Sequence, residues 1–201
     1  MSEVLSFAHL GFRHIVDATA LDHILFLLAL AAIYRGRDWR DSLWVISAFT
    51  VGHSMTLALV ATGTLNLPNR LIEILIPFTI VATGVENIVV RERARAPLGG
   101  HYRPIFAAVF GLVHGAGFAN YLQSLFTGSI LVPLVSFNVG IELGQMLVLA
   151  VALLFLMALD QLLGAFVSPH PVPSAFRLRV LGVSAAVVLS AAWMTATRVP
   201  W

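Results

Sequence analysis

Four ionisable side chains open the first strongly apolar segment of the chain. The stretch HIVDATALDHILFLLAL, residues 14 to 30, begins with His14, Asp17, Asp22 and His23 and ends as an uninterrupted apolar run. A charged side chain near the centre of a bilayer costs roughly 3 kcal/mol or more, so it usually persists there for a function. On an ideal helix His14 and His23 point to opposite sides. If both serve one site, the helix must begin or break between them.

Four later apolar segments contribute an ionisable side chain each. His53 lies within FTVGHSMTLAL and His114 within FGLVHGAGFA, while Asn138, Glu142 and Gln145 follow one another at i, i+4 and i+7 on one helix face. The candidate metal ligands are His14, Asp22, His23, His53, Glu86, His114 and Glu142. Three further polar side chains are predicted to support ligands, orient a substrate or pack helices: Ser54, Asn138 and Gln145.

The set of candidates is more informative than any single member. A lone intramembrane histidine is explained equally well by an interhelical hydrogen bond worth under about 1 kcal/mol. Several imidazoles and carboxylates buried without partners would be prohibitive, whereas one shared cation offsets several of them. The chain has no lysine and little arginine inside its apolar segments, which argues against ion pairing as the alternative. Nitrogen and oxygen ligands without sulfur suit nickel, cobalt, zinc, iron or manganese.

Composition identifies the elements that must position these residues. Of 201 residues, 59% are hydrophobic and only 11% are charged, and the mean hydropathy is +0.90. Soluble domains are about 25% charged, and the apolar runs are much longer than barrel strands. We therefore predict an all-α transmembrane helical bundle forming a single domain over residues 1–201. About six spans are expected, at 15–34, 42–62, 70–90, 104–123, 131–158 and 179–197. Residues 1–14 are too polar to span and could form a short interfacial or re-entrant helix.

The arginines predict the orientation of the bundle in the membrane. Nine of the twelve basic residues lie in the loops after spans one and three and before span six, and three lie on the other side. By the positive-inside rule, both termini are extracytoplasmic. The basic composition thus reflects membrane orientation and not nucleic-acid binding. The absence of cysteine excludes disulfides and thiolate metal sites.

Several strings within residues 11–150 resemble the HupE/UreJ family of bacterial membrane proteins. The matching stretches are GFRHIVDATALDHILFLLAL, FTVGHSMTLALV, LIEILIPFTIVATGVENIV, VFGLVHGAGFANYLQSL and LVSFNVGIELGQMLVL. The family is associated with nickel supply to hydrogenase and urease, and its members are generally described as nickel or cobalt permeases. The resemblance implies that the first-helix motif His14, Asp22 and His23, together with His114, is needed for uptake. The interval between His14 and Asp22 is longer here than is usual in the family.

Two functions from different classes fit these residues. The first is transport of a divalent transition metal ion, most simply nickel or cobalt, across the bacterial inner membrane. The second is a membrane-embedded metalloenzyme, hydrolytic or oxygen-using, with one or two metal ions, although the HExxH and ExxH spacings of familiar metalloenzymes are missing. A structural bundle without metal is a third reading. The expected partners are a metal ion and the lipid bilayer, and a homo-oligomer is compatible with the sequence.

Overall fold

The protein is an all-α bundle, as the sequence predicts. The computed structural model describes residues 2–17, 21–92, 100–125, 129–166 and 174–198, and these residues form helices and connections without any strand. The elements are α1 (Glu3–Val16), α2 (Leu21–Ala32), the 3-10 helix η1 (Gly36–Asp38), α3 (Trp39–Ala61), α4 (Asn69–Val90), α5 (Arg103–Leu125), α6 (Leu131–Phe166) and α7 (Ala175–Arg198).

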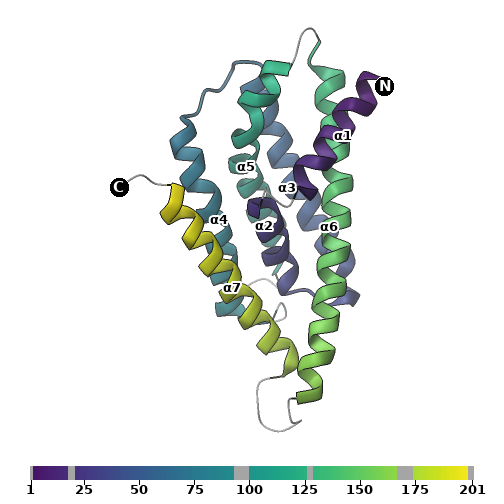
Figure 1. Cartoon of the computed structure of the whole chain (residues 1–201), viewed down its shortest axis with the longest axis vertical. Helices are drawn as coiled ribbons and strands as arrows, with labels where there is room; N and C mark the ends of the chain where they lie inside the picture. Colours follow the sequence, from purple (N-terminus) through teal and green to yellow (C-terminus); the bar gives the residue numbers. More distant parts are fainter. Residues whose placement is uncertain (1, 18–20, 93–99, 126–128, 167–173, 199–201) are drawn as a thin grey trace.

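The short helix α2 lies at the centre of the bundle (Figure 1). The other helices pack around it most extensively as three pairs, α3 with α5, α1 with α6 and α4 with α7, and α2 contacts members of all three. Phe26, Ala29, Ala31 and Ala32 of α2 have no exposed surface. A helix segment that is apolar on every side is stable where its sides are covered, and the residues of α2 from Phe26 to Ala32 are buried or partly buried.

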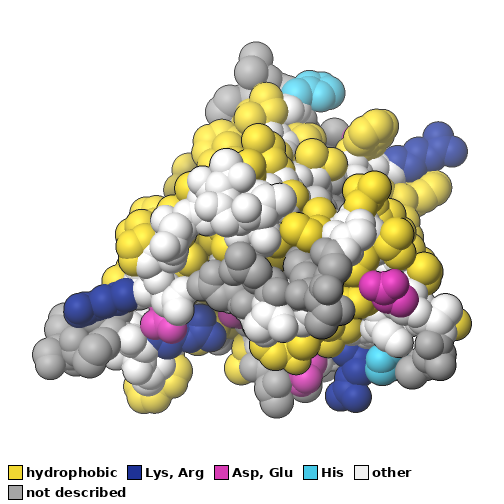
Figure 2. Space-filling view, turned by 90° about the horizontal axis from the view of Figure 1, so that it is seen from above, with side chains coloured by type: hydrophobic (Ala, Val, Ile, Leu, Met, Phe, Trp, Pro, Cys, Tyr) yellow, Lys and Arg dark blue, Asp and Glu magenta, His cyan; other side chains and the backbone are white. Residues whose placement is uncertain are grey.

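Figure 1 also defines the two ends of the bundle used below. At the upper end, α1 begins, α3 ends, α4 begins, α5 ends and α6 begins; at the lower end, α2 ends, α3 begins, α6 ends and α7 begins. Figure 2 views the molecule from above, and hydrophobic side chains cover much of this surface, with charged side chains scattered at its margin. Large apolar side chains such as Trp44, Val89 and Trp193 are more than two-thirds exposed. Exposed apolar side chains of this size suit a lipid environment.

Four helical segments are long and apolar enough to cross a membrane. They are Gly36–Ala61, Asn69–Val90, Leu131–Ala165 and Ala175–Arg198. The pair α1 and α2 would form a fifth if it is one broken span, and Arg103–Ala119 of α5 is a shorter apolar stretch. These helices establish a membrane protein, while the number of six spans stays a prediction.

The first span predicted at 15–34 is not one continuous helix. It is replaced by the end of α1 and the whole of α2, whose axes differ in direction by 68°. α1 ends because Asp17 adopts an extended backbone conformation, with φ of −65° and ψ of 119°. Aspartate favours helix ends, since its side chain competes for backbone hydrogen bonds. The sequence required such a break if His14 and His23 were to share a site, and the described helices provide it.

Glycines allow α3 and α5 to touch through their backbones. A Cβ atom on Gly111 would lie 2.1 Å from the carbonyl oxygen of Phe49, and one on Gly115 would lie 2.2 Å from that of His53. Both distances are far below van der Waals contact, so only glycine fits. The spacing of these glycines predicts a close helix contact of the small-xxx-small kind, and the packing confirms it. The contact fixes the backbone of His53 against the helix that carries His114.

The same device holds α1 against α6. A Cβ atom on Gly11 would lie 2.0 Å from the carbonyl oxygen of Phe137, and one on Gly140 would lie 1.9 Å from that of Ala8. Gly11 is less than one helical turn before His14. The close packing therefore sets the depth at which the His14 ring enters the bundle.

Candidate metal centre

Four imidazole rings from four helices meet in the interior of the bundle. The ring centroid of His14 on α1 lies 4.5 Å from that of His23 on α2 and 6.3 Å from that of His53 on α3. His114 on α5 completes the group, with its centroid 5.6 Å from that of His23. One ligand atom each of His14, His23 and His53 can be chosen so that all three lie within 4.8 Å of one another. This spacing is suited to a single ion among the rings.

The ring nitrogens of this cluster lack the partners that burial normally demands. His53 has no exposed surface, and His114 and His23 are 2% and 7% exposed. Among the described residues, Nε2 of His14, Nε2 of His23, Nδ1 of His114 and both ring nitrogens of His53 have no hydrogen-bond partner. A buried polar group without a partner costs on the order of 1 to 3 kcal/mol. Several such nitrogens around one space match the donor set of a divalent transition metal.

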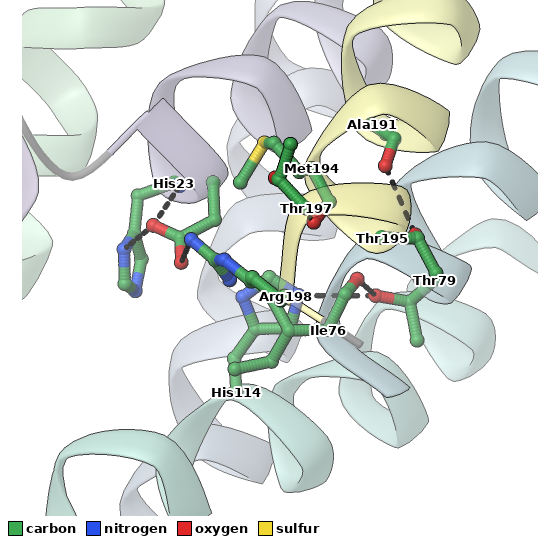
Figure 3. A network of polar contacts seen from close by, with 10 residues as sticks. His23, Ile76, Thr79, His114, Ala191, Met194, Thr195, Thr197 and Arg198 are labelled. Carbon is green, nitrogen blue, oxygen red and sulfur yellow. Dashed lines mark hydrogen bonds and ion pairs between the residues drawn. The ribbon is translucent and has the colours of Figure 1, made fainter. Parts of the chain in front are cut away.

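A threonine fixes the proton of His114. The Thr79 hydroxyl donates to the carbonyl oxygen of Ile76 at 2.7 Å, and its oxygen lies 3.0 Å from Nε2 of His114 (Figure 3). Because the hydroxyl proton is already used, the ring must donate from Nε2. The lone pair of His114 is then on Nδ1, which is the nitrogen without a partner. Hydrogen bonds of this kind orient metal-ligating histidines and raise their basicity.

A carboxylate does the same for His23. Oδ1 of Asp22 lies 3.2 Å from Nδ1 of His23 and also accepts from the His23 backbone N–H at 3.0 Å. Nδ1 therefore carries the proton, and Nε2 presents its lone pair to the other rings. The second oxygen of Asp22 lies 3.6 Å from Nη2 of Arg198, the last residue of α7. Asp22 is thus shared between an imidazole and a guanidinium.

A cavity of about 590 Å³ reaches the histidines. It lies between the beginning of α4, the last part of α5 and the end of α7, so it approaches from the upper half of the bundle. Its lining includes both acidic and basic groups beside the rings: His14, Asp22, His23, Asn69, Glu73, His114, Tyr121 and Arg198. Hydrated ions therefore have space on this side of the site.

Aromatic rings also border the site: Phe26 and Phe49 do not line this cavity, whereas Phe118 forms part of its wall. The ring centroids of Phe26 and Phe49 lie 5.0 Å and 5.2 Å from that of His114, and 4.8 Å from each other. Phe118 lies 4.1 Å from His14 by the same measure. Apolar walls keep water away and strengthen the interaction of any bound charge with its ligands.

The structure places Glu86 in a different cluster from the histidines. Its Oε2 lies 3.1 Å from Nη2 of Arg103, and its Oε1 accepts a hydrogen bond from the hydroxyl of Tyr102. The expectation that these carboxylates lack arginine partners is wrong, because Arg103 pairs with Glu86 and Arg198 with Asp22. Arg198 follows the last predicted span directly, and nothing in its sequence context relates it to Asp22.

The polar stripe of α6 faces α3. Glu142 accepts a hydrogen bond from Ser47 at 2.7 Å, and Gln145 accepts one from Thr50 at 2.7 Å. Asn138 donates to the carbonyl oxygen of Leu134, and its Oδ1 is buried without a partner among the described residues. Glu142 therefore stays a predicted ligand, with a hydroxyl of α3 as its observed partner.

Among the described residues, Ser54 has a contact within its own helix. Its hydroxyl donates to the carbonyl oxygen of Thr50 within α3 at 2.7 Å. Thr79 of α4 matters more for a metal, because it contacts His114. Helical spacing places Thr79 on one face with Thr83 and Glu86 but does not show what this face contacts. The contact of Thr79 with His114 joins two different helices, α4 and α5, so the spacing of residues within one helix could not reveal it.

The fold and site together define a class of helical bundle with long apolar helices and a buried cluster of four histidines. The chain belongs to the HupE/UreJ family, because the family model described as HupE / UreJ protein matches residues 1–197. Comparison with curated proteins gave no match, and comparison with solved structures gave none. The family suggests an accessory or transport role for nickel or cobalt.

Proposed function

We propose that the protein transports a divalent transition metal ion, nickel or cobalt, across the bacterial inner membrane through its histidine cluster. The observation that carries this proposal is the set of buried ring nitrogens without a partner among the described residues. They belong to His14, His23 and His53, whose ligand atoms lie within 4.8 Å of one another, and to His114, whose ring is adjacent to that of His23. Ligands near the middle of a bundle, carried by broken helices, are a recurrent arrangement in transporters. The break between α1 and α2 places His14 and His23 on its two sides.

The proposal includes six membrane crossings, with α1 and α2 together forming the first. The helices then alternate in direction, so that α7 runs from the lower end upward (Figure 1). Both termini would lie on the extracytoplasmic side, and the upper cavity would open there. The basic residues after α2 and at the beginning of α7 support this orientation, since they gather at the lower end.

The charge around the histidines favours moderate affinity, which a permease needs. Asp22 is the carboxylate nearest to the rings among the observed contacts, and Arg198 partly neutralises it. An ion entering by the upper cavity would pass Glu73 and reach the imidazoles of His14, His23 and His114, which line the same cavity. Release can be coupled to protons, because protonation of imidazole or carboxylate lowers metal affinity.

The test is flux measured together with binding. Purified protein is reconstituted in liposomes that contain a metal-sensitive dye, and Ni²⁺ or Co²⁺ is added outside. We expect saturable uptake by the wild-type protein and loss of uptake in His114→Ala. Tight binding of the metal by a wild-type protein that passes no ion would overturn the transport proposal.

One observation favours the enzyme as the second candidate function. The cavity of about 590 Å³ is larger than a hydrated ion requires and is lined by groups that could hold an organic substrate, such as Asn69 and Tyr121. A metalloenzyme would retain its ion through purification, and a dinuclear site would hold two ions roughly 3.5 to 4 Å apart. Metal content and anomalous scattering of the purified protein separate this candidate from a transporter with one exchangeable ion.

A further inference from the structure

The lower half of the bundle contains a second polar cluster, built around Glu86 of α4. Both carboxylate oxygens are used, one by the Tyr102 hydroxyl and the other by the guanidinium of Arg103. Arg103 is 4% exposed and also donates to Oδ1 of Asn87 at 3.0 Å. Burial and the neighbouring Glu86 raise the pKa of Tyr102 to about 12, so its hydroxyl stays protonated and donates to the carboxylate.

Glu86 borders two cavities at once. A small cavity of about 100 Å³ is lined by Glu86 and Arg103 together with Thr83, Leu30 and Phe110. A more open hollow of about 700 Å³ is lined by Glu86 and Tyr102 with the last residues of α4. The carboxylate therefore lies between an inner space and the outside of the bundle.

A polar face of α4 connects this cluster with the histidines. Thr79, Thr83 and Glu86 are spaced i, i+4 and i+7, so they share one face of the helix. Thr79 lies 3.0 Å from His114, and Thr83 donates to the Thr79 carbonyl oxygen at 2.9 Å and lines the small cavity. Aromatic rings interrupt this route, because Phe110 borders the small cavity and lies 6.2 Å from Phe26, the ring beside His114.

We propose that Glu86 is a second binding site for the divalent cation, on the exit side of the aromatic rings, and that Arg103 occupies it as a tethered cation until the ion arrives. This inference rests on the proposed transport function. Arginine stays charged at any physiological pH, so it can leave the carboxylate but cannot become neutral beside it. Asn87 can hold the displaced guanidinium, since it already accepts from the same Nη2 nitrogen. The exchange leaves the ion on oxygen ligands, which bind nickel or cobalt more weakly than imidazoles do.

The first experiment compares binding and flux in Glu86→Gln. Co²⁺ is the probe, its binding to purified protein is followed by visible absorption, and its uptake is followed in liposomes. We expect binding at the histidines within about twofold of wild type and uptake lowered at least tenfold. The matched control is Glu92→Gln, which removes a carboxylate near the same end of α4 that also pairs with an arginine, Arg177 at 2.8 Å, but lines neither cavity.

The second experiment removes the tethered cation. Arg103→Gln should bind one additional Co²⁺ weakly, and the double variant with Glu86→Gln should lose that additional ion. Should Arg103→Gln fail to fold, Arg103→Lys and the Glu86→Gln flux assay still decide the question, with faster Co²⁺ exchange expected in the lysine variant.

The outcomes separate the two proposals. Wild-type uptake that Glu86→Gln leaves unchanged would overturn the role of Glu86 and leave transport intact. A wild-type protein without any uptake would overturn both. An additional Co²⁺ that persists in the double variant would locate the second ion elsewhere and contradict this inference.

Discussion

The histidine cluster and the Glu86 cluster are both buried and polar, but they differ in how their hydrogen-bonding capacity is used. The imidazoles keep unpartnered nitrogens among the described residues, whereas both oxygens of Glu86 are occupied, by Tyr102 and Arg103. Ligand atoms without hydrogen-bond partners are free to bind an ion. A carboxylate whose oxygens are already paired can bind an ion only after one of its partners has moved away. Under the proposed function, this difference makes the histidines the site that is ready to bind and Glu86 a site that Arg103 must first leave.

The two clusters also differ in how many helices build them. The histidines come from α1, α2, α3 and α5, and the glycine contacts of α3 with α5 and of α1 with α6 fix three of these helices pairwise. Glu86, Asn87, Tyr102 and Arg103 come only from the end of α4 and the beginning of α5. A site assembled from four rigid helices is precise, while a contact between two neighbouring helix ends can change at less cost.

The largest expected effect comes from removing a ring of the histidine cluster. His23→Ala should lower Ni²⁺ or Co²⁺ affinity by more than the roughly 10- to 100-fold that loss of an outer hydrogen-bond partner causes. The measurement is isothermal titration of the purified protein with the metal. His9→Ala is the control, because His9 lies on the same bent helix pair but is exposed. Unchanged affinity in His23→Ala would contradict the proposal, since the histidine cluster would then not be the binding site.

The next effect in size concerns the packing beneath the rings. Gly115→Ala would place a Cβ atom 2.2 Å from the His53 carbonyl oxygen, so α3 and α5 must separate. Overpacking typically costs about 1 to 3 kcal/mol, and a backbone clash belongs at the upper end of that range. We expect a clearly lower unfolding temperature and weaker metal binding.

Gly182→Ala on α7 is the matched control for this variant. A Cβ atom there meets nothing within 4 Å, so alanine should be neutral or slightly stabilising because of its higher helix propensity. Equal unfolding temperatures for Gly115→Ala and wild type would show that the two helices do not depend on the glycine contact.

A smaller loss of metal affinity is expected when His114 loses the hydrogen bond that orients its ring. Thr79→Val keeps the shape of the side chain but removes the oxygen that accepts from Nε2 of His114. Metal affinity should fall about 10- to 100-fold, the usual effect of an outer partner. Thr195→Val removes a hydroxyl that only donates to the Ala191 carbonyl oxygen, so it should leave metal affinity unchanged. A similar loss in both variants would mean that packing, and not orientation, explains the result.

The fold class of the molecule can be predicted from the sequence more fully than the side-chain contacts between its helices can. Composition and apolar runs give an all-α membrane bundle, and the opposed directions of His14 and His23 on an ideal helix require the break that α1 and α2 show. Helical spacing also places Thr79, Thr83 and Glu86 on one face. Periodicity describes one helix at a time, so it locates side chains within a helix but not the partner that each will find on another.

The ion pairs illustrate what periodicity omits. Arg198 lies 176 positions after Asp22, and Arg103 is separated from Glu86 by a connection between helices. Both arginines were counted in the sequence only as markers of membrane orientation. Long side chains near helix ends can reach back toward the interior, and which carboxylate they meet depends on helix packing.

The last and smallest expected effect is a gain in metal affinity, in contrast to the losses above, and it concerns Arg198. Its guanidinium lies 3.6 Å from Asp22 and lines the cavity above the histidines, so it repels an arriving cation and reduces the charge of the nearby carboxylate. Arg198→Gln should therefore tighten Co²⁺ binding about tenfold, which corresponds to roughly 1.4 kcal/mol. Arg198→Lys, which keeps the charge, and Arg70→Gln, which removes an exposed charge from the first turn of α4, should both stay near the wild-type affinity. Titration at two salt concentrations provides the check, because an effect that acts through a partly exposed charge weakens as salt increases.

Weaker binding in Arg198→Gln would show instead that the arginine holds Asp22 in position for His23. The upper carboxylate would then depend on its arginine for geometry, whereas Glu86 would still have to lose its own before binding an ion.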